Sequence, residues 1–261
     1  MHMEFTLVIT LALAVLVGVS LGLLGGGGSI LTVPILTYVL GMPPKEAIAA
    51  SLFVVGTTAV VSVISHARAG RVAWRTGIIF GLAGMTGAFI GGLLGGYIPG
   101  AILMLLFAAM MVATAVAMIR GRKKSGGEGA ERGHLPILRI LLDGFAVGLV
   151  TGLVGAGGGF LIVPALVLLG GLPMALAVGT SLLIIAMKSF AGLGGYLLTV
   201  QLDWPVVLGV TAAAIVGSFI GARLVGIVPE KALRQGFGWF VLAMGAFILF
   251  QEVPPIIQSM M

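Results

Sequence analysis

The sequence predicts an all-α polytopic membrane protein with two inverted repeats, eight full transmembrane helices and two short broken or re-entrant segments. Three observations predict this class: an extreme hydrophobicity, a series of apolar runs of spanning length, and a duplication of the whole pattern. Of the 261 residues, 59% are hydrophobic and 8% are charged, and the mean hydropathy is +1.23. Soluble domains carry about 25% charged residues, so we expect most of this surface to face lipid.

Eight apolar runs have the length of about 20 residues that a membrane span requires. In chain order they cover residues 5–24, 46–66, 77–97, 100–119, 141–157, 175–197, 205–225 and 234–251. The residues before the first run lack the basic segment of a secretory signal, so we expect this run to be a transmembrane helix. Two further runs, 28–41 and 158–171, have 14 residues each. As helices they reach only about 21 Å, short of the ~30 Å apolar core.

The two short runs reveal an internal duplication. The sequence GLLGGGGSILTVP ends at Pro34, and GLVGAGGGFLIVP ends at Pro164, 130 residues later. The same offset pairs Trp74 with Trp204, in a chain with 3 Trp, which argues against shared low complexity. We therefore expect a first transmembrane repeat at 1–119, a basic cytoplasmic linker at 120–139 and a second transmembrane repeat at 140–261.

The distribution of positive charge bears on the orientation of the repeats, because Lys and Arg gather on the cytoplasmic side of membrane proteins. If the short runs cross the membrane, each repeat has an odd number of crossings and the repeats are inverted. Twelve of the 14 basic residues then lie inside, and only Lys45 lies outside. If the short runs are re-entrant, the repeats are parallel, and nine basic residues lie inside against four outside. The charges favour inverted repeats with both termini outside.

A glycine cluster precedes each short run. The first comprises Gly25, Gly26, Gly27, Gly28 and Ser29, and the second includes Gly155, Gly157, Gly158 and Gly159. A helix that begins inside the bilayer points unpaired N–H groups and a partial positive charge at whatever lies beyond its start. In an inverted arrangement we expect the two helix starts to approach one another near mid-depth and to bind an anion. The alternative is that these glycines only form tight turns and helix contacts.

Lys188 is the only charge well inside a predicted span, the run 175–197. An ammonium at this depth costs a few kcal/mol or more unless it is partnered. It lies too centrally to reach the interface easily, so we interpret it as an anion partner or a titrating switch rather than a snorkelling side chain. Its repeat-related residue is Thr58, so the predicted site is not symmetric in charge.

Two serines, Ser51 and Ser181, occupy matched positions on repeat-related helices. Each hydroxyl has two alternative roles. It can donate a hydrogen bond to an oxyanion, or it can donate to its own helix backbone, as buried Ser and Thr often do. The sequence leaves both open, and we include both serines in the candidate site.

Several functions lack the residues that they require. There is no Cys, which excludes disulfides and thiol chemistry, and no cofactor or metal site is predicted. All eight carboxylates lie in loops or at the ends of spans, which argues against a cation pump. The three histidines, His2, His66 and His134, lie outside the deep part of any span, which argues against an intramembrane enzyme. The net charge of +6 reflects the loops rather than a nucleic-acid partner, and the sequence leaves homo-oligomerisation open.

The motif GLLGGGGSILTVPIL followed by LGMPPKEAIAASL, repeated as GLVGAGGGFLIVPAL and GGLPMALAVGTSL, resembles the TauE/SafE family of sulfite exporter-like TSUP permeases. The likeness extends over about residues 5–250. It implies a multi-pass transporter in the cell inner membrane or plasma membrane of a bacterium or archaeon. It also implies a sulfur-containing anion as substrate, such as sulfite, sulfoacetate or another organosulfonate. The first copy keeps Gly-Gly-Gly-Gly-Ser, whereas the second has Ala156 within the cluster.

These observations lead to one hypothesis with an alternative. We expect a permease, an exporter by preference, that moves a small sulfur-containing anion by alternating access. Its binding site is expected near mid-membrane, between the glycine clusters and close to Lys188. The alternative is a transporter or channel for another small anion or solute.

Overall fold

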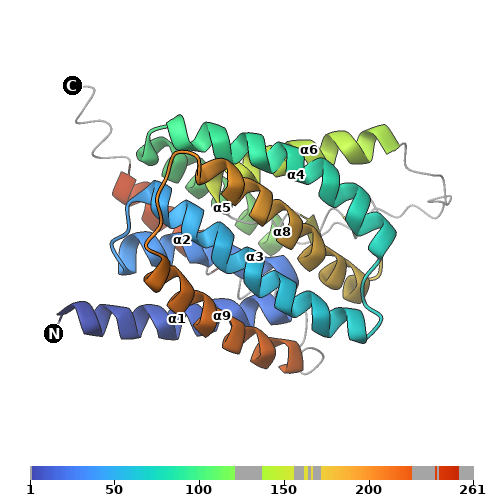
Figure 1. The fold of residues 1–261 in the computed structure, drawn as a ribbon, viewed down its shortest axis with the longest axis horizontal. Coiled ribbons are helices and arrows are strands. Elements are labelled where there is room, and N and C mark those ends of the chain that lie inside the picture. The colour runs from blue at the N-terminus through green and yellow to red at the C-terminus, as the bar shows by residue number, and fades with distance from the viewer. Residues whose placement is uncertain are drawn as a thin grey trace.

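A computed structural model of the chain describes residues 2–120, 137–155, 172–224 and 241–252, and positions 162, 163, 166 and 239. Every regular element in these residues is helical (Figure 1). The long helices are α1 (His2–Leu24), α3 (Pro44–Arg68), α4 (Trp74–Tyr97), α5 (Gly100–Arg120), α6 (Ile137–Val154), α8 (Met174–Tyr196) and α9 (Trp204–Leu224). A further apolar helix covers Val241–Glu252. The predicted all-helical class is confirmed for the described residues, whereas the linker prediction falls mainly on residues outside them.

Four of the described helices are long and apolar enough to cross a membrane: Pro44–Arg68, Trp74–Tyr97, Leu176–Tyr196 and Trp204–Leu224. The other predicted crossings coincide with shorter apolar helices, so the number of eight full crossings stays a prediction. The outer faces of α4 and α9 carry exposed large apolar side chains at repeat-related positions, Phe89 with Phe219 and Ile90 with Ile220. Apolar faces of this kind fit a lipid environment.

The first short run forms an irregular helical segment between α1 and α3. A 3₁₀-helix, η1 (Gly25–Leu31), leads into one α-helical turn, α2 (Thr32–Pro34), and then into a π-helix, η2 (Ile35–Val39). Pro34 explains the change in winding, because proline has no N–H and its ring crowds the carbonyl four residues earlier. Gly41, with φ of 76°, then ends the segment before α3 begins.

The duplication is visible in the backbone hydrogen bonds. The amide of Met42 donates to the carbonyl of Leu36 at 3.0 Å, and its repeat-related bond joins Leu172 and Leu166 at 3.1 Å. Two further pairs of backbone hydrogen bonds are related by the 130-residue offset. The amide of Ala47 donates to the carbonyl of Pro43 as that of Ala177 donates to Pro173, and the amide of Gly77 donates to Ala73 as that of Val207 donates to Asp203. The two repeats therefore begin their corresponding helices with the same local geometry.

The helices of the two repeats pack against one another rather than each repeat packing alone. Helix α1 packs on α9, and the repeat-related pair, α6 and α4, packs in the same way. Helix α3 packs on both α8 and α9, and α8 packs on α4 as well as on α3. Glycines bring these backbones together. A Cβ at Gly18 would overlap the carbonyl oxygen of Ala214, and one at Gly87 would overlap that of Phe145.

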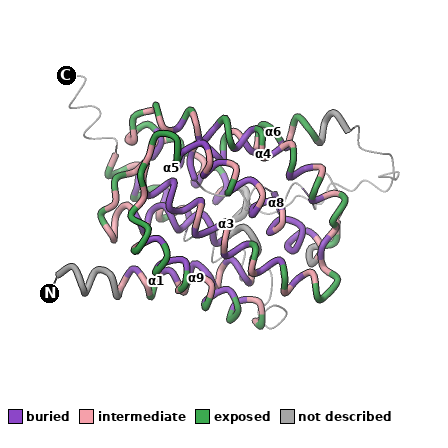
Figure 2. Tube along the Cα trace, in the orientation of Figure 1, coloured by how far each residue is buried: buried purple, intermediate pink, exposed green. Residues whose placement is uncertain are grey.

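Helices α3 and α8 form the centre of the molecule (Figure 2). In the span segments of both, 72% of the residues are buried, against 44% for α4 and 39% for α9. Gly56 on α3 faces Ser189 on α8, whereas His66, later on α3, faces Gly179, earlier on α8. These two repeat-related helices therefore run antiparallel.

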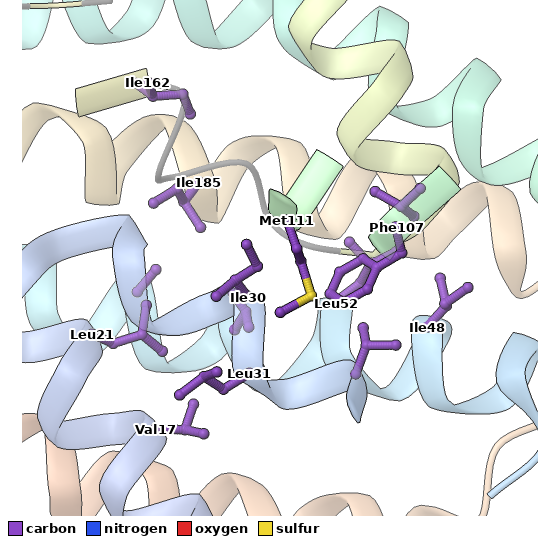
Figure 3. Packing of buried hydrophobic residues seen from close by; sticks show 14 of the residues in the cluster. Val17, Leu21, Ile30, Leu31, Ile48, Leu52, Phe107, Met111, Ile162 and Ile185 are labelled. Atoms are coloured by element: carbon purple, nitrogen blue, oxygen red, sulfur yellow. The ribbon is translucent and has the colours of Figure 1, made fainter. Parts of the chain in front are cut away.

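Apolar side chains fill the space beside this central pair. Ile30 from η1, Leu52 from α3, and Phe107 and Met111 from α5 converge in one buried cluster, with Ile185 from α8 close by (Figure 3). Each of them except Leu52, which is 1% exposed, is fully buried. Polar groups in this interior are consequently few, and each one needs a structural or functional explanation.

Candidate functional site

Lys188 lies near the middle of α8 and is only 1% exposed. Its Nζ donates a hydrogen bond to Thr151 Oγ1 on α6 at 3.0 Å. The Thr151 hydroxyl in turn donates to the carbonyl of Val147, at 2.7 Å, and therefore presents a lone pair to the lysine. The ammonium is thus held in one position deep in the helix bundle.

Helix α4 provides the room for this side chain through a glycine. A Cβ at Gly84 would lie 2.6 Å from Lys188 Cδ, closer than non-bonded carbon atoms approach. The residues 130 positions away from Lys188, Thr151 and Gly84 are respectively Thr58, Leu21 and Ala214. Lys188, its acceptor Thr151 and the glycine that makes room for it therefore have no counterpart at the repeat-related positions.

In the part of the chain that the structure describes, no buried acid supplies a counter-charge to Lys188. Across the described residues, the buried polar side chains are hydroxyls, His66 and Lys188, with no Asp or Glu. One hydrogen bond to a neutral hydroxyl leaves most of the cost of desolvating a buried cation uncompensated. The side chain of the next residue, Ser189, is fully buried with no hydrogen-bond partner for its Oγ, but it faces Gly56 on α3, whereas Lys188 faces α4 and α6. The arrangement around Lys188 is suited to receiving an anion.

Gly28 and Gly155, from the two glycine clusters, have different neighbours. Gly28 folds back on α1, where a Cβ would lie 2.7 Å from Ser20 Cβ. The last turn of α1 contacts the last turn of α3, where the backbone of Gly22 lies against His66. Gly155, with φ of 69°, ends α6 and packs on Ile48 near the start of α3.

The expectation that the two helix starts meet at mid-depth stays a prediction, because the start of the second short run lies outside the described residues. Ile48 and His66 are 18 residues apart on α3 (66 − 48), which corresponds to about 27 Å along the helix axis. The last turn of α1, at Gly22, and the end of α6, at Gly155, therefore lie toward opposite ends of α3. Lys188, by contrast, lies next to Ser189 and hence at the level of Gly56, about midway between them.

The other predicted site residues have varied surroundings. Ser51 Oγ donates to the carbonyl of Gly155 at 3.0 Å and so ties α3 to the start of the second cluster. Ser181 Oγ donates to Val178 in its own helix at 2.7 Å. Ser29 is buried within η1 together with Gly28, and Gly25, Gly26 and Gly27 belong to the same 3₁₀-helix. Gly157, Gly158 and Gly159 lie outside the described residues.

The sequence alone did not single out Thr151 and Gly84. Threonine in an apolar helix usually bonds to its own backbone, and Thr151 does so as well. Gly84 is one of 43 glycines. One feature of the sequence did mark these two positions: Thr151 and Gly84 both differ from the residues at the repeat-related positions, as Lys188 does.

Comparison with known proteins agrees with the architecture. The profile of the family described as Sulfite exporter TauE/SafE matches residues 10–248. A "Probable membrane transporter protein" of Xylella fastidiosa strain 9a5c is 36% identical, over 95% of this chain and 96% of its own length. A probable membrane transporter protein of Methanocaldococcus jannaschii is 29% identical, over 95% of this chain and 98% of its own length. The probable membrane transporter protein YdhB of Bacillus subtilis is 26% identical, over 90% of this chain and 97% of its own length. No solved structure matches. The chain belongs to the sulfite exporter TauE/SafE family and is a multi-pass membrane transporter.

Proposed function

We propose that this transporter carries a small sulfur-containing anion, such as sulfite, sulfoacetate or another organosulfonate, and binds it at Lys188. The observation that carries the proposal is a buried lysine amine with one neutral hydrogen-bond acceptor and no buried carboxylate in the described residues. An anion at Nζ would supply the missing counter-charge, and charge-assisted hydrogen bonds to its oxygens would fix its position. The family description supports the choice of a sulfur oxyanion.

The proposed mechanism is alternating access by two inverted repeats. The antiparallel course of α3 and α8 supports inversion, because these helices occupy the same position in the two repeats. The loop between α3 and α4 carries Arg71 with Arg68 and Arg75 beside it, whereas the repeat-related loop carries Asp203. The positive charges would place the α3–α4 loop in the cytoplasm of a cell whose inner or plasma membrane holds the protein.

The proposed direction is export. An inside-negative potential drives a monovalent anion outward with about 2.3 kcal/mol per 100 mV, so export needs no coupling ion. In the described residues no buried carboxylate is available to couple transport to protons in the usual way.

A flux panel tests the substrate. The protein in liposomes is presented with sulfite, methanesulfonate, sulfoacetate, acetate, phosphate and Na⁺, and the uptake of each is followed with and without an imposed potential. Saturable flux of the sulfur anions that the potential accelerates supports the proposal. Flux of acetate or phosphate with none of the sulfur anions would replace it with the alternative of another small anion.

Single-cysteine labelling tests the orientation, because the chain has no Cys of its own. Ala69→Cys reports on the loop between α3 and α4, and Gln201→Cys on the repeat-related loop between α8 and α9. An impermeant maleimide should label the two from opposite sides of the membrane. Labelling of both from the same side would show that the repeats are not inverted.

A further inference from the structure

Three arginines gather at the turn that joins α3 to α4. Arg68 is the last residue of α3, Arg71 lies within the turn, and Arg75 is the second residue of α4. Arg68 and Arg75 are exposed and Arg71 is half-buried. Residues 44–97, from the start of α3 to the end of α4, contain one carboxylate, Glu46, in the first turn of α3 at the far end of that helix. Helix α8, which packs on both, contains none, so the three guanidinium groups have no acidic partner on these helices.

The backbone of this turn is held in one geometry. Gly70, with φ of 67°, follows α3, and its amide donates to the carbonyl of Ala67 at 3.0 Å. The amide of Arg71 donates to the carbonyl of His66 at 2.9 Å. These two bonds are the Schellman pattern, which ends a helix and reverses the chain. Gly179 on α8 packs against the carbonyl of Arg71, because a Cβ there would overlap its oxygen, and so fixes the turn from the other side.

Both helices carry a row of exposed apolar side chains that reaches this turn. The members of each row are four residues apart and therefore lie on one face of their helix. They are 41% to 56% exposed: Val60 and Ile64 on α3, and Trp74, Ile78 and Leu82 on α4. Arg68 continues the first row at the same spacing, and Arg75 follows Trp74 directly. Helix α8 lies between α3 and α4 and packs on both (Figure 1).

An acidic phospholipid has the chemistry that fits this combination. Guanidinium groups present paired donors that match phosphate oxygens and form charge-assisted hydrogen bonds with them. Acyl chains lie favourably against exposed apolar side chains, and an indole such as that of Trp74 is typical of the headgroup level. A free phosphate would contact only the arginines and would leave the two apolar rows without a ligand.

We propose that Arg68, Arg71 and Arg75 form a binding site for the phosphate of an acidic phospholipid whose acyl chains lie along the apolar rows of α3 and α4. The orientation proposed above places this site at the cytoplasmic leaflet, which attracts basic segments through its acidic lipids. The site is separate from Lys188, and lipid binding there does not depend on which anion is transported.

Native mass spectrometry of the purified protein in detergent measures the binding of added phosphatidylglycerol and phosphatidylcholine, which differ in the net charge of the headgroup. Phosphatidylglycerol should bind more tightly. Arg68→Gln, Arg71→Gln and Arg75→Gln should each raise its Kd about fivefold and leave the Kd of phosphatidylcholine unchanged. All three side chains reach solvent, so the unfolding midpoint without lipid should stay at the parental value.

Arg223→Gln is the matched control. Arg223 is an exposed arginine in the last turn of α9, and its loss changes the net charge by the same amount. It belongs to the same end of the bundle, because the neighbouring Ala222 packs on Gly22, which lies against His66. Arg223 is not part of the two apolar rows, so this control should bind both lipids with the parental Kd.

A further arm uses glycerol 3-phosphate, which carries the phosphate without acyl chains and should bind at least tenfold more weakly than phosphatidylglycerol. Equal Kd values for the two lipids would overturn the assignment. An equal loss in Arg223→Gln would reduce it to a general effect of positive charge. Glycerol 3-phosphate that binds as tightly as the lipid would show that the arginines serve a soluble anion instead.

Discussion

Replacement of Lys188 by methionine should weaken anion binding and at the same time leave the fold intact or more stable. Methionine has a similar length and can lie in the space that Gly84 provides. Thr151 would lose the lysine but keep its own hydrogen bond to the carbonyl of Val147 at 2.7 Å, so no buried donor is left unpaired. The only group removed is the charge with its single hydrogen bond.

The two effects have opposite signs. Removing one partner of a buried, hydrogen-bonded charge pair costs about 2–5 kcal/mol, which corresponds to a loss of about 30- to 4,000-fold in affinity. Replacing a buried ion by an apolar side chain of similar volume is neutral or stabilising by about 1–4 kcal/mol. We therefore expect Lys188→Met to lose measurable sulfite and methanesulfonate transport while its thermal midpoint stays the same or rises.

The assay measures uptake into liposomes and the unfolding midpoint of the purified protein in detergent. Lys45→Met is the matched control: Lys45 Nζ donates to the carbonyl of Gly96 at 2.8 Å near the end of α4, far from the proposed site. This control should transport within about twofold of the parent, because charges near the surface contribute little. A Lys188→Met protein with parental transport and a lower midpoint would show that the lysine is structural.

Two glycine substitutions give further predictions. In Gly84→Ala the new methyl group would lie 2.6 Å from the buried lysine side chain and displace it; we expect a stability loss of about 1–3 kcal/mol and a higher KM for the anion. Parental KM would argue against the site. In Gly87→Ala the methyl group would overlap the carbonyl oxygen of Phe145, which should force α4 away from α6 and lower the unfolding midpoint. The matched control is Gly194→Ala, because its new Cβ would lie 3.8 Å from the ring of Phe89, an ordinary contact, and should leave the midpoint unchanged. Equal midpoints would contradict this account of the packing.

The sequence predicted the positions of the helices well, because apolar runs between charged loops are a strong signal. The predicted span 46–66 lies within α3, and the predicted span 205–225 nearly coincides with α9. The pairing of Trp74 with Trp204 correctly indicated a duplication, as the repeated hydrogen bonds of the two halves now show. These features depend on local composition, which a linear sequence displays directly.

The site was predicted less completely, because it depends on which helices pack together. Lys188 stood out as a charge in an apolar run, but its neighbours Thr151 and Gly84 come from α6 and α4, which no local pattern brings together. The expected meeting of the two helix starts stays a prediction, because the start of the second short run lies outside the described residues. His66, which the sequence places outside the deep part of any predicted span, is nevertheless buried.

The most direct test of the account is the position of a bound anion. Selenite is the heavier congener of sulfite, and its selenium can be located by anomalous diffraction from a crystal of the parent protein. Charge-assisted hydrogen bonds of 2.7–2.9 Å to its oxygens would place the selenium about 4 Å from Lys188 Nζ. The account predicts a peak there that is absent from crystals of Lys188→Met. A peak at the glycine clusters, or one that persists without the lysine, would contradict it.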